Sequence, residues 1–80
     1  MTPLKLLILQ TLSKRGPQSE LDLLCELREA CKSSTVIVYA CVDLQSGGFI
    51  QTAQNDPHSW QLTPKGMEQV ASLRGAKANV

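Results

Sequence analysis

Three cysteines and one histidine are the side chains of this sequence best suited to metal binding or nucleophilic catalysis. Cys25, Cys31 and Cys41 lack the Cys-x-x-Cys spacing of a zinc site, and their odd number argues against a closed disulfide framework. We expect them to be small buried hydrophobic side chains in a reducing cytoplasm. His58 lies in a predicted turn without a catalytic partner at recognisable spacing, and Gly47-Gly48 lacks the lysine and helix of a phosphate loop. The sequence therefore predicts no metal, no cofactor and no enzymatic activity.

Length and composition restrict the fold to one small globular domain. The chain has 80 residues, far fewer than the ~250 of a (β/α)8 barrel, and its 42% apolar content is typical of a globular protein. The apolar run from Leu6 to Leu9 is much shorter than the ~20 residues of a membrane span, and no signal peptide is recognisable. We therefore expect a cytoplasmic protein without membrane contact. The net charge of +1 is small for a nucleic-acid-binding domain, which usually carries a basic surplus.

Two helices are predicted in the first 32 residues. Thr2-Pro3 can open the first helix, and Gly16-Pro17 ends it. Ser19 and Asp22 fit the capping signal of the second helix, with Lys32 near its C-terminus. The inward faces are predicted from helical spacing as Leu4, Leu7, Ile8, Thr11 and Leu12 in the first helix, and Leu21, Leu24, Leu27 and Cys31 in the second.

The segment 36–44 is compatible with either a strand or a helix. Three successive β-branched residues at its start favour a strand. Ile37, Cys41 and Leu44, however, recur at helical spacing between a serine pair that can cap a helix and a glycine pair that can end one. We therefore predict a third helix whose core face carries these three residues.

A β-hairpin and one more helix are predicted after the glycine pair. Residues 49–54 form the first strand, Asn55-Asp56-Pro57 the turn, and residues 59–62 the second strand. A hairpin alone is marginal in water, so its apolar residues must pack on the helices. Thr63-Pro64 opens the last helix, and residues 75–80 are predicted to be a disordered tail after a domain of residues 1–74. The predicted hairpin anchors are Phe49, Trp60 and Leu62, and the predicted inward face of the last helix is Met67, Val70 and Ala71.

Two stretches carry a resemblance to a known kind of protein. Residues 35–50 run from Thr-Val-Ile to Leu-Gln-Ser-Gly-Gly-Phe-Ile, and residues 60–66 read Trp-Gln-Leu-Thr-Pro-Lys-Gly. The first resembles the third helix and wing start of the winged helix-turn-helix domains in PadR-like and MarR-like bacterial regulators. The second is similar to their aromatic-x-Leu-Thr-x-x-Gly signature, and the resemblance covers about residues 4–73. It implies an α+β, mostly α, fold with three helices, a two-stranded wing and a C-terminal helix.

Members of these families usually add longer helices for dimerisation, whereas this chain ends just after the helix that follows the wing. The absence of those helices argues against the usual family dimer and suits a minimal domain, such as a phage- or plasmid-borne regulator. A homodimer is expected only from the DNA-binding function.

The resemblance also implies a transcriptional regulator that reads duplex DNA. In these families the third helix enters the major groove, where it reads base edges, and the wing adds backbone contacts. Lys14 and Arg15 are further candidates for phosphate contacts, and the outward Asp43 opposes DNA except where it accepts from a cytosine amino group. The implied DNA-binding residues are Lys32, Ser33, Ser34, Thr35, Val38, Tyr39, Val42, Asn55, His58 and Lys65.

The distribution of charge leaves a second function open. No lysine or arginine lies between Lys32 and Lys65, an interval that contains the whole third helix and wing. Phosphate neutralisation supplies nearly all non-specific DNA affinity. Val38, Tyr39 and Val42, if they face outward, form a neutral apolar surface of the kind that marks protein partners. The alternative is therefore an adaptor or inhibitor that binds a protein through this face.

Overall fold

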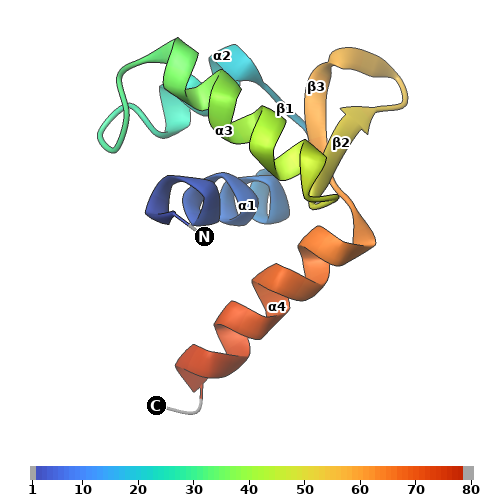
Figure 1. Ribbon diagram of the computed structural model, residues 1–80. Helices are drawn as coiled ribbons and strands as arrows, with labels where there is room; N and C mark the ends of the chain where they lie inside the picture. Colours follow the sequence, from blue (N-terminus) through green and yellow to red (C-terminus); the bar gives the residue numbers. More distant parts are fainter. Residues whose placement is uncertain (1, 79–80) are drawn as a thin grey trace.

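The computed structural model describes residues 2–78, which form a mixed fold that is mostly helical, as predicted. In Figure 1, α1, α2 and α3 form the body, the hairpin of β2 and β3 stands at one side, and α4 leads away from the body. The strands make one antiparallel sheet in the order β1-β3-β2. The elements are α1 (Pro3–Arg15), β1 (Gln18–Ser19), α2 (Glu20–Glu26), α3 (Ser34–Ser46), β2 (Ile50–Ala53), β3 (Asp56–Leu62) and α4 (Pro64–Ala78).

Each helix begins at a hydroxyl side chain that the sequence predicted as its cap. Thr2, Ser33 and Thr63 each accept a hydrogen bond from the backbone N–H three residues further on, at 3.4, 3.4 and 3.1 Å. At α2, Ser19 and Asp22 form a reciprocal capping box, with 3.2 Å bonds in both directions. These bonds satisfy N–H groups that a helix start leaves without partners, so the four starting points are set by local chemistry.

The second helix is shorter than predicted and buries Leu23 in place of Leu21. It ends at Glu26 rather than near Lys32. Leu23 is fully buried, whereas Leu21 is 72% exposed, so the predicted inward position of Leu21 is wrong. The other three predicted inward residues are confirmed, because Leu27 is buried and Leu24 and Cys31 pack against the core. The leucine-rich run permits either helical phase, and the observed phase lets Leu27, at the C-cap, also reach the core.

The third helix is a helix and not a strand, as predicted. Ile37, Cys41 and Leu44 are its buried face, and Ala40 joins them. β-Branched residues lower helix propensity by a fraction of a kcal/mol each, whereas burying one large aliphatic side chain contributes about 1.5–3 kcal/mol. Burial therefore decides the conformation. The whole core consists of Ile8, Leu9, Leu12, Leu23, Leu27, Ile37, Ala40, Cys41, Leu44, Ile50, Trp60, Leu62 and Val70.

The cysteines differ in burial, which corrects the expectation that all are core residues. Cys41 is buried, Cys31 is half-buried, and Cys25 is exposed because α2 turns Leu23 inward instead. Burial, with a smaller contribution from the Glu20 carboxylate, raises the pKa of the Cys41 thiol from 9.0 to about 12.

We expect alkylation to distinguish these thiols. At pH 8, a pKa of about 12 leaves Cys41 with a thiolate fraction about a thousandfold smaller than that of a thiol with a pKa of 9.0. Iodoacetamide should therefore label Cys25 in the native protein within minutes and Cys41 only after unfolding in guanidinium, as read by peptide mass spectrometry. Labelling of Cys41 at the rate of Cys25 in the native protein would contradict the packing behind α3.

The sheet contains a third strand that the sequence did not predict. In β1, Gln18 pairs with Trp60 and Ser19 pairs with Ser59. A strand of two residues has no periodicity of its own, and its partners lie some forty positions further along the chain. β3 is therefore the central strand, with β1 and β2 on its two sides.

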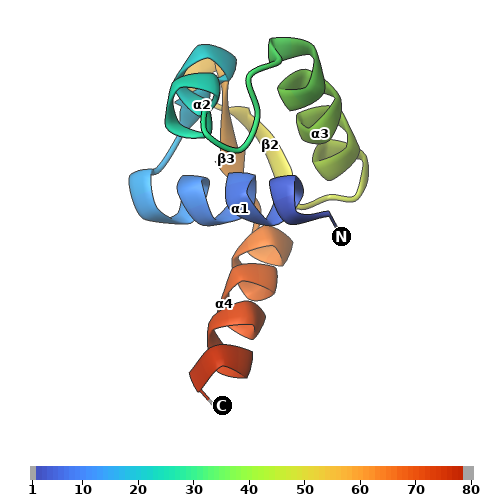
Figure 2. The ribbon, with the colours of Figure 1, turned by 90° about the vertical axis from the view of Figure 1, so that its left-hand side faces the viewer.

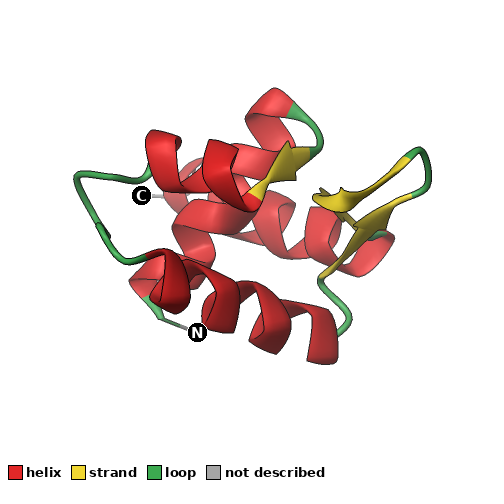
Figure 3. Cartoon of the chain, turned by 90° about the horizontal axis from the view of Figure 1, so that it is seen from above, coloured by secondary structure: helices red, strands yellow, loops and turns green. Residues whose placement is uncertain are grey.

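The hairpin turn lies earlier than predicted. Ala53 pairs with Asp56 across the two-residue connection Gln54-Asn55, next to an irregularity in register at Ala53, so Asp56 already belongs to β3. The Asp56 carboxylate accepts from the His58 N–H at 2.9 Å and from the Ser59 hydroxyl at 2.8 Å, which fixes the start of the strand. Seen from above, the connection between the two strands protrudes beyond the helices (Figure 3).

The fourth helix contacts the body only along a narrow line among the side chains that the structure describes. Val70 is buried, as predicted, but Met67 is 58% exposed and Ala71 is exposed, which corrects two of the three predicted inward residues. The reason is that α4 leads away from α1 (Figure 2), so most of its circumference faces solvent. The helix extends to Ala78 and thus passes Gly75, where the tail was predicted to begin; residues 79–80 of that predicted tail lie outside the described part of the chain.

Candidate nucleic-acid interface

The third helix divides into a buried side and an uncovered side. With its core face fixed by Ile37 and Leu44, the opposite face presents Val36, Tyr39 and Val42, which are 45%, 67% and 45% exposed. Figure 2 shows α3 at one side of the molecule, with its outer side free of other elements. Single exposed apolar side chains are ordinary, but several on one helix face form the kind of patch that marks an interaction site.

The predicted contact residues of α3 fall mostly on this uncovered side. Ser34, Thr35, Tyr39 and Val42 are exposed, whereas Val38 is only half exposed. The predicted outward position of Val38 is therefore only partly correct, and Val36, which the sequence analysis did not select, is the more exposed valine.

The start of α3 carries polar and positively charged groups, in contrast to the apolar side chains of its outer side. Lys32 and Ser33 precede the helix, and both are exposed. The Ser33 hydroxyl already accepts from the Val36 N–H, as the cap of α3. The N-terminus of this thirteen-residue helix carries the positive end of its dipole, which favours an anion such as phosphate.

An ion pair neutralises the one acidic side chain on the outer side of α3. Lys5 Nζ of α1 lies 3.3 Å from Asp43 Oδ2, and the two side chains are 26% and 63% exposed. The Asp43 charge, which would oppose a DNA phosphate, is thus partly compensated within the protein. Sequence reasoning missed Lys5 because the partners lie 38 positions apart and no local pattern links them.

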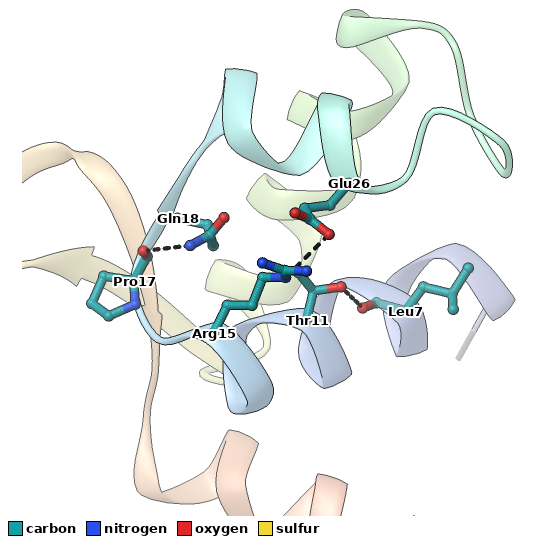
Figure 4. Close-up of polar contacts among 6 residues, drawn as sticks. All are labelled: Leu7, Thr11, Arg15, Pro17, Gln18 and Glu26. Carbon is teal, nitrogen blue, oxygen red and sulfur yellow. Dashed lines mark hydrogen bonds and ion pairs between the residues drawn. The ribbon is translucent and has the colours of Figure 1, made fainter.

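Other cations named as phosphate candidates are held by the protein itself. Arg15 Nε lies 3.1 Å from Glu26 Oε2, which joins α1 to α2 (Figure 4). Lys65 Nζ donates to the Gly47 carbonyl oxygen at 2.6 Å and lies 4.7 Å from the centroid of the Phe49 ring. Lys65 therefore fastens the start of α4 to the end of α3, a role that the sequence did not predict.

The Thr-x-x-Gly stretch has a structural explanation in the same region. Thr63 Oγ1 donates to the Gly48 carbonyl oxygen at 2.5 Å, and the Thr63 N–H donates to the Phe49 carbonyl oxygen at 3.1 Å. A Cβ at Gly66 would collide with that same Phe49 oxygen. Gly48 has φ +81°, which favours glycine. The signature therefore holds the base of the wing against the first turn of α4.

We expect Gly66→Ala to destabilise the protein. Helix propensity alone would make alanine better than glycine by about 1 kcal/mol, but the collision with the Phe49 backbone should cost more, about 1–3 kcal/mol net. Urea unfolding followed by circular dichroism would measure it, with Ser72→Ala on the exposed side of α4 as the control. A Gly66→Ala variant more stable than the native protein would contradict this close approach.

The wing tip places Asn55 and His58 in solvent. Both are exposed, next to the exposed Asp56. The hydrogen bonds from the His58 N–H and the Ser59 hydroxyl lower the pKa of the Asp56 carboxyl, so the tip carries a negative charge near neutral pH. The tip therefore offers hydrogen-bonding groups rather than positive charge.

This arrangement of elements defines the winged helix-turn-helix fold. The structure of the transcriptional regulator BldR from Sulfolobus solfataricus superposes with a TM-score of 0.78 at 20% sequence identity. The match covers 99% of this chain and 57% of the BldR chain, so this chain spans little more than half the length of that protein. No family model matches the sequence, and no curated protein matches it.

Residues 2–78 carry neither a metal-binding cluster nor a membrane-spanning helix. No cluster of three or more His, Cys, Asp or Glu side chains there could hold a metal ion. Nor does this part of the chain contain a helix with the length and apolar character needed to cross a membrane.

Proposed function

We propose that this protein binds duplex DNA as a transcriptional regulator, with α3 in the major groove. The observation that carries the proposal is the uncovered outer side of α3, where Thr35, Tyr39 and Val42 stand opposite a fully buried face. A helix held by one side and free on the other is what the major groove admits. The fold likeness to a solved transcriptional regulator supports the same function.

Contacts to the DNA backbone would come from both ends of this surface. Lys32, Ser33 and Ser34 stand at the start of α3, and Asn55 and His58 stand at the tip of the wing. These groups donate hydrogen bonds to phosphate oxygens, which fixes register on the duplex without reading sequence. Lys65 adds a further cation beside the wing base, and a homodimer in the cytoplasm would double the set.

Fluorescence anisotropy with a labelled duplex from the region upstream of the protein's own coding sequence tests the proposal. Each phosphate contact contributes about 0.9 to the slope of log K against log salt, so few cations predict a shallow slope of roughly 2–4 for one subunit. Tyr39→Ala should weaken binding about tenfold or more, whereas Met67→Ala on α4 should leave it unchanged. No binding at 20 mM salt to any duplex would overturn the proposal.

A second function is favoured by one observation on the same surface. Val36, Tyr39 and Val42 are exposed apolar side chains, and residues 33–64 contain no lysine or arginine. Such a face also suits an adaptor or inhibitor docked on a protein partner. A photo-crosslinking amino acid at position 39 separates the two in cells, because a DNA adduct supports the regulator and a discrete protein adduct supports the adaptor.

A further inference from the structure

The outer side of α3 lacks the side chains that read guanine. Arginine or lysine hydrogen-bonded to guanine O6 and N7 is the commonest specific contact in the major groove, and residues 33–64 contain neither. Lys5 reaches this face from α1, but it is paired with Asp43 at 3.3 Å. Asp43, the group suited to a cytosine amino group, is engaged by the same ion pair. Neither base of a G·C pair therefore finds its usual partner on α3.

What this side presents instead is methyl groups beside hydroxyl groups. Thr35, Tyr39 and Val42 follow one another at i, i+4 and i+7, so they form one stripe along the helix, and Val36 flanks it. In the major groove thymine shows a C5-methyl group next to its O4 acceptor. A protein methyl group that packs on the thymine C5-methyl and a hydroxyl that donates to the thymine O4 are together complementary to this base.

The spacing along α3 fits successive base pairs. Thr35 and Val42 are seven residues apart, about 10 Å along the axis at 1.5 Å per residue. That length matches about three base-pair steps of 3.4 Å. The methyl groups at the two ends of the stripe can therefore meet two different thymines in one groove.

We propose that α3 selects A·T base pairs by packing the methyl groups of Thr35, Val36 and Val42 against thymine C5-methyl groups, with Tyr39 donating to a thymine O4. The inference rests on the proposed DNA-binding function and names the bases that this site reads. It assigns specificity to the methyl contacts and the Tyr39 hydrogen bond, whereas the phosphate contacts carry no sequence preference.

Duplexes that differ only in the thymine methyl group test this assignment. Three 24-bp probes are compared at equal salt by fluorescence anisotropy. The first contains only A·T pairs, the second only A·U pairs and the third only G·C pairs, each in alternating sequence. Loss of one buried methyl corresponds to about fourfold in affinity, so A·T should bind more tightly than A·U by about sixteenfold for two contacted thymines. A probe of G·5-methyl-C pairs should regain part of the affinity that the G·C probe lacks.

Variants locate the effect on α3. Val42→Ala should reduce the preference for A·T over A·U about fourfold, because binding to A·T should weaken more than binding to A·U. Met67→Ala, which trims an apolar side chain on α4 that is 58% exposed against 45% for Val42, should keep the full preference. Circular dichroism confirms that both variants are folded.

The outcomes separate the two levels of the proposal. Equal binding of the A·T and A·U probes would overturn the thymine reading while leaving DNA binding intact. Absence of binding to all probes at 20 mM salt, together with a protein adduct at position 39, would overturn both and identify the α3 face as a protein-docking surface.

Discussion

Replacement of Trp60 by alanine is expected to lower the free energy of unfolding by about 3–5 kcal/mol. Trp60 is 9% exposed and belongs to the central strand, where it stands opposite Gln18 in β1 and Thr52 in β2. Its loss leaves a cavity where both strand pairings meet. Because a small domain has only about 5–15 kcal/mol of stability in total, this one change should remove much of it.

Urea unfolding followed by circular dichroism at 222 nm measures the effect of Trp60→Ala. Met67→Ala is the control, since its side chain is 58% exposed and its removal should cost less than about 0.5 kcal/mol. A loss of less than 1 kcal/mol for Trp60→Ala would show that the sheet does not depend on this side chain.

Replacing Asp43 by asparagine is expected to strengthen DNA binding by about five- to tenfold at 50 mM salt. The change removes a negative charge from the outer side of α3 and frees Lys5 for a phosphate, because the 3.3 Å ion pair no longer exists. One additional phosphate contact should steepen the slope of log K against log salt by about 0.9. A salt titration by fluorescence anisotropy records both quantities.

The structure provides a matched control for this charge effect. Glu26→Gln changes the net charge by the same amount and frees Arg15, but at the contact between α1 and α2 rather than on the outer side of α3 (Figure 4). It should alter affinity by less than half as much. Equal gains from both variants would mean that net charge, and not the α3 face, governs binding.

The sequence predicted those parts of the fold that depend on short-range chemistry. Caps at Thr2, Ser19, Ser33 and Thr63 mark the helix starts because each acts over three residues. The helical period likewise identified the buried face of α3, and the two-residue alternation of a strand identified the buried pair Trp60 and Leu62.

Features that depend on distant partners could not be predicted in this way. β1 exists because Gln18 and Ser19 pair with β3, and two residues carry no pattern of their own. The phase of α2 was ambiguous because Leu21 and Leu23 are equally apolar, and only tertiary packing selects Leu23. The pairing of Lys5 with Asp43 belongs to the same class, since it depends on how α1 crosses α3.

The candidate site was predicted in outline rather than in detail. Hydroxyl groups at the start of α3 and Tyr39 on its outer side are exposed, in keeping with the sequence interpretation. Lys65, by contrast, donates a hydrogen bond to the Gly47 carbonyl oxygen, which its position in the sequence does not indicate. The two residues come together only because the hairpin between them folds back.

The fastening of α4 to α3 has a mechanical consequence. Lys65 and Thr63, at the start of α4, bond the carbonyl groups of Gly47 and Gly48 at the end of α3. α4 has 15 residues, about 22 Å of rigid rod, and it leads away from the body. A change in the angle of α4 is therefore transmitted to the C-terminal end of α3. A tilt of α4 by about 10° would move its far end by about 4 Å and would also displace the end of α3. The orientation of α3 is therefore coupled to the angle of α4.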